Sequence, residues 1–218
     1  MRPDAVIFDL WDTLVDWRVD DARRMLHLVA ERVGMEPDAF HERWDAVAGA
    51  RYVGPIRPTL RSVGIAEDAI EDVCAIRLDY NRRALVPREG AVDTLRTLRG
   101  RGIAVGLITV CSEEVEQLFP ETELAGLFDA EVFSNAEGLT KPDPAIYRLC
   151  CERLGVEPER SVFVGDGAND ELAGARRVGM EAILIHRRGE DPYWPELRTW
   201  DGPRVTSIPE VLEVLELC

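Results

Sequence analysis

The chain has 218 residues, of which 46% are hydrophobic, and this suits one large domain or a core with a smaller insertion. Its 41 acidic residues outnumber its 26 basic ones, and the net charge of −15 disfavours binding to nucleic acid or to an anionic membrane. No apolar run reaches the ~18 residues that a membrane span needs, and no signal-peptide pattern is found. We therefore expect a soluble, cytoplasmic protein without membrane partners.

Strands and helices are predicted to alternate along most of the chain. Short apolar runs predict strands, and apolar residues at helical spacing predict helices. The strands are expected at 5–9, 103–109, 130–133, 161–165 and 182–185, and helices at 91–98, 144–154, 170–178 and 209–217. Asp143 and Pro144 supply an N-cap and a first-turn proline for the second of these helices. Residues 187–206 are polar and proline-containing, and we expect a surface loop there.

A block of about 70 residues between the first strand and the rest lacks strand patterns. Segments 22–33 and 66–85 have helical spacing, and Gly54-Pro55 interrupts the block. Alternation elsewhere favours a parallel sheet that helices cover on both faces. The predicted fold is thus a three-layer, Rossmann-like α/β core (residues 1–15 and 87–218) with an all-helical insertion (residues 16–86) over the strand ends.

Polar residues capable of chemistry follow several predicted strands. Asp9 ends the first strand and Thr109 the second, Lys141 precedes a helix, and Asp166 and Asp170 follow a later strand. Because the carboxyl ends of parallel strands share one edge of the sheet, we expect these side chains to converge.

Lys141 is the only lysine among the 26 basic residues; the other 25 are arginines. The sequence leaves two explanations open. The site may require a compact ammonium group, or one lysine may simply have survived in a chain biased toward arginine.

With Asp9, Thr109, Lys141 and the acidic pair Asp166 and Asp170 in this order, the chain resembles the haloacid dehalogenase-like hydrolase superfamily. The resemblance extends over nearly the whole chain. It implies that Asp9 is a nucleophile, that Thr109 and Lys141 assist it, and that residues 16–86 form a helical cap.

The resemblance also implies a phosphatase-type reaction on a small phosphorylated metabolite through an aspartyl-phosphate on Asp9. Mg²⁺ would relieve the repulsion between the carboxylate and the phosphate. Its expected ligands are Asp9, Asp166, Asp170 and a main-chain carbonyl at Trp11, with Glu171 as a rival to Asp170. The expected phosphate-binding residues are Trp11, Asp12, Thr13, Val110 and Lys141.

One position departs from the family pattern. Phosphatases of the superfamily carry a second aspartate two residues after the nucleophile, which protonates the leaving oxygen, whereas this chain has Trp11. The neighbouring Asp12 is a possible replacement.

Two alternative functions therefore stay open: a metal-independent 2-haloacid dehalogenase, whose halide needs no proton, and a phosphate-binding or regulatory protein with impaired catalysis. Phosphonate hydrolysis is disfavoured because it would need a cap lysine, and residues 16–86 contain none.

Overall fold

The protein is described here by a computed structural model that covers residues 2–186 and 195–216. Its centre is a six-stranded sheet in the order β3-β2-β1-β4-β5-β6, in which neighbouring strands pair in parallel. The strands are β1 (Ala5–Phe8), β2 (Ala104–Thr109), β3 (Ala130–Phe133), β4 (Ser161–Gly165), β5 (Glu181–Ile185) and β6 (Arg204–Val205). The chain crosses to opposite sides of β1 for β2 and β4, so the carboxyl end of β1 lies at the point where ligands bind in such sheets.

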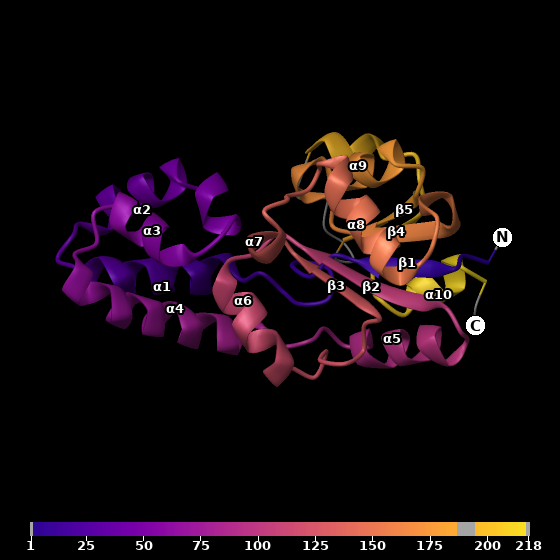
Figure 1. Ribbon diagram of the computed structural model, residues 1–218, viewed down its shortest axis with the longest axis horizontal. Coiled ribbons are helices and arrows are strands. Elements are labelled where there is room, and N and C mark those ends of the chain that lie inside the picture. Colours follow the sequence, from indigo (N-terminus) through magenta and orange to yellow (C-terminus); the bar gives the residue numbers. More distant parts are fainter. Residues whose placement is uncertain (1, 187–194, 217–218) are drawn as a thin grey trace.

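Apolar side chains cover both faces of the sheet. In β1, Val6 and Phe8 belong to one buried cluster and Ile7 to another, because alternate residues of a strand point to opposite faces. Helices complete the outer layers, as Figure 1 shows. They include α5 (Ala91–Gly100) and α10 (Glu210–Val214) on the first face, and α8 (Pro144–Leu154) and α9 (Glu171–Arg177) on the second. The three-layer α/β core predicted from the sequence is confirmed.

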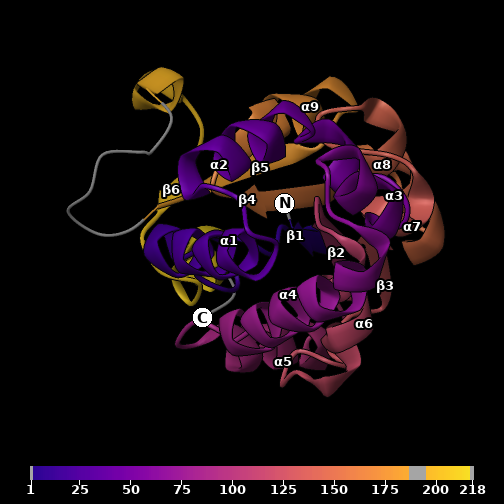
Figure 2. The ribbon, with the colours of Figure 1, turned by 90° about the vertical axis from the view of Figure 1, so that its left-hand side faces the viewer.

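The segment between β1 and α5 is helical, and we call residues 19–84 the helical insertion. It contains α1 (Val19–Arg32), α2 (Pro37–Ala46), the 3-10 turn η1 (Gly49–Tyr52), α3 (Ile56–Ser62) and α4 (Ile70–Ala84). Its buried residues, among them Val29, Phe40 and Val73, form an apolar cluster of their own. The insertion lies beyond the carboxyl end of β1 in Figure 1, and Figure 2 views the molecule from its side.

The two chain segments that join the insertion to the sheet are tied together by Arg88. Its main-chain nitrogen donates to the Leu14 carbonyl at 2.8 Å. Its guanidinium donates to the carbonyls of Asp12 and Thr13 and to the Asp16 carboxylate. The Arg88 side chain thus joins the segment that leads into the helical insertion to the segment that leads out of it.

A buried ion pair also joins the insertion to the sheet region. Arg77 on α4 donates to Glu114 on α6 (Glu113–Leu118) at 2.5 Å and to the Ser112 hydroxyl at 3.3 Å. Arg77 is 5% exposed and Glu114 3% exposed. Such a pair is sensitive to the loss of either partner, because the remaining charge stays buried.

The predicted elements agree with the structure apart from their boundaries and a few short pieces. The last strand, β6, falls within the segment 187–206 that we expected to be a loop, of which residues 187–194 lie outside the described part. The short helices α6 and α7 (Ser134–Glu137) were not predicted either. No helix in the described part of the chain is both long and apolar enough to span a membrane.

Candidate active site

Asp9 lies directly after β1, at the centre of the sheet's carboxyl edge. Its main-chain nitrogen donates to the Val164 carbonyl of β4 at 2.9 Å, which continues the strand pairing by one residue. The side chain is 4% exposed. A nearly buried carboxylate is costly unless other groups balance its charge, so its neighbours are informative.

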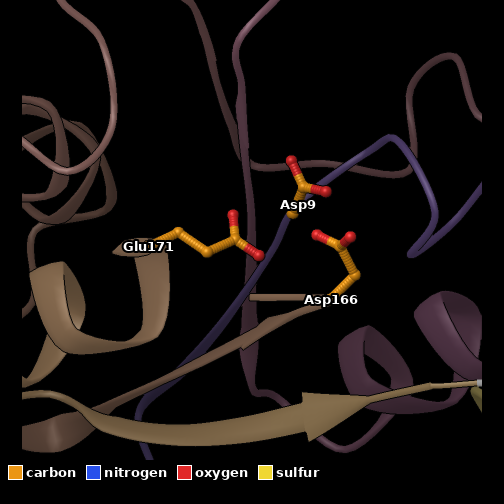
Figure 3. Close-up of side chains that lie close together, drawn as sticks. All are labelled: Asp9, Asp166 and Glu171. Carbon is orange, nitrogen blue, oxygen red and sulfur yellow. The ribbon is translucent and has the colours of Figure 1, made fainter. Parts of the chain in front are cut away.

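Two further carboxylates approach Asp9. Asp166 follows β4, Glu171 is the first residue of α9, and oxygen atoms of the three side chains lie within 4.8 Å of one another. Figure 3 shows the three carboxylates converging from the two strand ends and the helix start. Asp170, which we expected here, is exposed and does not belong to this group.

The local backbone explains why Glu171 takes the place predicted for Asp170. Asn169 and Asp170 both have left-handed conformations, with φ of 53° and 58°, so the chain turns sharply before α9 begins. Glu171 is fully buried, and its Oε1 accepts from the Gly167 main chain at 2.9 Å. A Cβ on Gly165 would lie 2.1 Å from that same Oε1, so this position requires glycine.

Lys141 bridges the carboxylates from the loop before α8. Its Nζ donates to Asp9 and to Glu171, each at 2.5 Å, and its side chain is buried. The compact ammonium therefore joins the strand end to the helix start. This contact favours the functional explanation of the single lysine over chance.

The charges at the site shift the pKa values of its members. Burial raises the pKa of Asp166 to about 6, and the Asp9 carboxylate adds to this effect. Burial also raises the pKa of Glu171. Burial opposes the charged form of Lys141, but Asp9 and Glu171 outweigh it and raise its pKa above the ordinary lysine value. Lys141 is thus held in its charged form, whereas the ionised forms of Asp166 and Glu171 are disfavoured unless a further cation offsets their charge.

Two threonine hydroxyls, in the loop after β1 and at the end of β2, are buried without a partner among the residues that the structure describes. Thr13 and Thr109 are fully buried, and within the described residues neither hydroxyl oxygen has a hydrogen-bond partner. The thiol of Cys111, close to Thr109, donates instead to Asn135 at 3.4 Å. Buried unpaired hydroxyls are uncommon, and they are expected where a ligand completes the bonding.

The remaining predicted positions lie at the rim. Trp11 is half-buried, packs against the apolar cluster of the sheet, and meets Trp17 edge-on with ring centroids 6.2 Å apart. Asp12 has φ of 53° and directs its carboxylate to the Trp17 main chain and Arg88. Val110 follows β2 and is half-buried. The role of Arg88 was not anticipated, because nothing in its sequence neighbourhood marks it among 25 arginines.

This arrangement agrees with comparisons to known proteins. A family model described as haloacid dehalogenase-like hydrolase matches residues 3–179, most of the chain. The chain belongs to the haloacid dehalogenase-like hydrolases.

Both phosphatases and dehalogenases of this superfamily are similar to the chain in sequence or in structure. A glyceraldehyde 3-phosphate phosphatase of Pyrococcus furiosus is 27% identical over 99% of this chain and 94% of its own. A phosphatase structure from Thermococcus onnurineus has a TM-score of 0.69 at 22% identity and covers 97% of both chains. An L-2-haloacid dehalogenase structure from Xanthobacter autotrophicus has a TM-score of 0.65 at 18% identity and covers 98% of both. The two structural likenesses establish the fold, which phosphatases and dehalogenases share.

Proposed function

We propose that this hydrolase is a Mg²⁺-dependent phosphatase that acts on a small phosphorylated metabolite through Asp9. The observation that carries the proposal is the charge at the site. In their ionised forms, Asp9, Asp166 and Glu171 would place three negative charges against the one positive charge of Lys141. The two uncompensated charges match a divalent cation, which a dehalogenase would not require.

The donor set fits Mg²⁺, which prefers oxygen ligands. Asp9 and Asp166 would hold the ion, because one carboxylate oxygen of each lies outside the hydrogen bond that Asp9 accepts from Lys141 and that Asp166 accepts from Ala168. Both oxygens of Glu171 accept hydrogen bonds, so this residue contributes charge and holds Lys141. The Trp11 carbonyl remains our expected main-chain ligand. When bound, the ion would offset the repulsion between Asp9 and the phosphate and polarise the phosphoryl oxygens.

The protein's own groups would perform the transfer. A carboxylate oxygen of Asp9 attacks phosphorus, and the bond from phosphorus to the leaving oxygen breaks with its electron pair on that oxygen. Water then attacks the aspartyl-phosphate, which releases inorganic phosphate and restores Asp9. Lys141 and the hydroxyls of Thr13 and Thr109 would donate to the phosphoryl oxygens. We assign Asp12 and Val110, which follow β1 and β2, to the phosphate-binding loops of this site.

Trp11 limits the range of substrates in this proposal. An indole cannot protonate the leaving oxygen, and the loss of a general acid typically lowers the rate by about 10²- to 10⁴-fold. Substrates whose leaving groups are stable as anions, such as aryl and acyl phosphates, should therefore react best. We also propose that residues 16–86 act as the cap that encloses the substrate.

The test is Mg²⁺-dependent hydrolysis of p-nitrophenyl phosphate and acetyl phosphate by the wild type and by Asp9→Asn. We expect turnover that a chelator abolishes, and a loss of at least about 10³-fold in Asp9→Asn because the nucleophile is removed. Turnover that persists in Asp9→Asn, or that survives chelation, would exclude the proposed chemistry.

A second candidate is dehalogenation of small 2-haloacids, which Trp11 favours because halide leaves without a proton. Release of chloride from 2-chloropropionate in the presence of a chelator would select this function. If neither the phosphate substrates nor 2-chloropropionate is turned over, and a phosphate analogue binds tightly, the protein would instead have a binding or regulatory function.

A further inference from the structure

Two of the chain's three histidines lie against each other in the helical insertion. His27 is on α1 and His41 is on α2, and these two helices pack together. The ring centres are 5.2 Å apart, and the ring planes are inclined by 35°. His27 is exposed and His41 is half-buried, so an ion from solution can reach the pair.

The protein leaves one nitrogen of this pair without a partner. Nε2 of His41 is buried and accepts or donates no hydrogen bond within the described part of the chain. One nitrogen of a neutral imidazole is a donor and the other an acceptor, so Nε2 carries either an unpaired proton or an unpaired lone pair. Buried polar atoms are rarely left in this state. Packing of the two rings therefore explains their contact but not the unsatisfied nitrogen, whereas a ligand bound between them would explain both.

The distance between the rings suits two imidazoles bound to one metal ion. An imidazole nitrogen binds zinc at about 2.0–2.1 Å along the line from the ring centre, so each ring centre lies roughly 3.2 Å from the ion. A tetrahedral angle between the two bonds then places the ring centres about 5.2 Å apart. The observed separation is 5.2 Å, so the helices already hold the rings at the spacing that one ion requires.

Charged side chains around the histidines favour a cation. Residues three or four positions apart are neighbours on a helix surface. Glu31, Asp38 and Asp45 each have this spacing from one of the histidines, as do Arg23 and Arg24. Carboxylates thus outnumber arginines next to the pair, in a chain whose net charge is −15.

We propose that His27 and His41 form a binding site for zinc or a similar late first-row divalent ion, which links α1 to α2. Imidazole nitrogens select such ions over Mg²⁺, which prefers oxygen ligands. Within the described residues, three potential ligands gather only at Asp9, Asp166 and Glu171, so water would complete the coordination at the histidines. Because the ion binds both rings only when the two helices are packed, its binding stabilises the insertion.

The experiment measures thermal stability in Zn²⁺ without any substrate. The full-length wild type is compared with His27→Gln and His41→Gln, in a buffer that contains excess Mg²⁺ to compete with Zn²⁺ at carboxylate groups. His27 is exposed, so His27→Gln keeps the apolar contacts of the insertion. The matched control is His186→Gln, which removes the third histidine. His186 follows β5, where its main-chain nitrogen donates to the Val205 carbonyl.

Two protein ligands suit a Kd for Zn²⁺ on the order of 10 µM. In about 0.1 mM free Zn²⁺, the melting temperature of the wild type should therefore rise by about 3–6 °C. His27→Gln and His41→Gln should each lose most of this rise, and His186→Gln should keep it. Calorimetric titration of Zn²⁺ should show a site in the wild type and in His186→Gln that is absent in His27→Gln.

An equal rise in the wild type and in His27→Gln would overturn the proposal, because the ion would then bind elsewhere. The absence of any rise in the wild type would overturn it as well. Neither measurement uses a substrate, so the result is independent of whether the protein proves to be a phosphatase.

Discussion

The Asp12 carboxylate accepts hydrogen bonds from the Trp17 main chain at 3.0 Å and from Arg88 at 3.4 Å. Arg88 also donates to the main-chain carbonyl of Asp12. Through these contacts, the Asp12 carboxylate stabilises the connection between the sheet and the helical insertion. They argue against Asp12 as a substitute for the absent general acid, although it is adjacent to Trp11 in the chain.

If the acid is absent, Trp11→Asp should restore it. We expect kcat for an alkyl phosphate to rise by about 10²- to 10⁴-fold, and that for p-nitrophenyl phosphate to rise less, because its leaving group is stable without a proton. Steady-state kinetics measure both. Trp11→Asn is the matched control, since it removes the same indole without adding an acid. Equal effects of the two substitutions would mean that the indole merely obstructs the site.

Glu171 and Asp170 allow a direct test of which acidic residue serves the site. Glu171→Gln removes a charge that holds Lys141, so we expect kcat to fall by at least about 10²-fold. Asp170→Asn changes an exposed side chain and should stay within about twofold of wild type. Assays of both variants at saturating Mg²⁺ make the comparison. A larger loss in Asp170→Asn would contradict the assignment of Glu171.

The pKa of Asp166 predicts a pH dependence of stability for the metal-free protein. Its folded pKa of about 6 exceeds the unfolded value of about 3.9, so the folded state binds more protons between these limits. The stability contribution of Asp166 therefore decreases as pH rises from about 4 to 6, and the full cost remains at pH 7.5.

Asp166→Asn removes this cost, so in a chelator its melting temperature should exceed that of the wild type at pH 7.5, with a smaller difference at pH 4.5. Mg²⁺ should stabilise the wild type more at pH 7.5 than at pH 5, because it competes with the proton, and should stabilise the variant little. Thermal melts at these pH values, with and without Mg²⁺, test both statements. A variant that melts lower than wild type in chelator at pH 7.5 would refute the first.

The buried pair of Arg77 and Glu114 should contribute strongly to the attachment of the insertion. Arg77→Ala leaves Glu114 buried and unpaired and should reduce the free energy of unfolding by about 3–5 kcal/mol. The double variant Arg77→Met with Glu114→Leu should recover much of this loss, because no buried charge remains. Urea denaturation of the wild type, Arg77→Met, Glu114→Leu and the double variant gives the coupling energy. Additive effects would show that the two residues act independently.

The sequence predicted the sheet well because most of its strands are buried on both faces and appear as short, largely apolar runs. β3 and β4 have the predicted bounds. The two-residue strand β6 was missed because Arg204 and Val205 have no periodicity to detect. The helix α6 was not predicted because one of its buried positions is the acidic Glu114, which gives no apolar signal in the sequence. An ion pair with Arg77 makes its burial possible.

The site was partly predictable for a related reason. Asp9, Thr109 and Asp166 follow from their places at strand ends, and Lys141 from its place before a predicted helix. The choice between Asp170 and Glu171 depends on two left-handed residues and the contact with Gly165, which is a matter of backbone geometry. The contacts of Arg88 join segments that are distant in the chain, and a single sequence carries no signal for them.

Because Lys141 is the chain's single lysine and is buried at the candidate active site, a reagent specific for amines would modify few positions in this protein. Apart from the amino terminus, a reagent that acylates primary amines has one target, and that target is covered in the structure described here. The rate of acylation at Lys141 would therefore report how often the candidate active site becomes exposed to solvent. Lys141 thus allows solvent exposure of this site to be followed in the native protein without an introduced label.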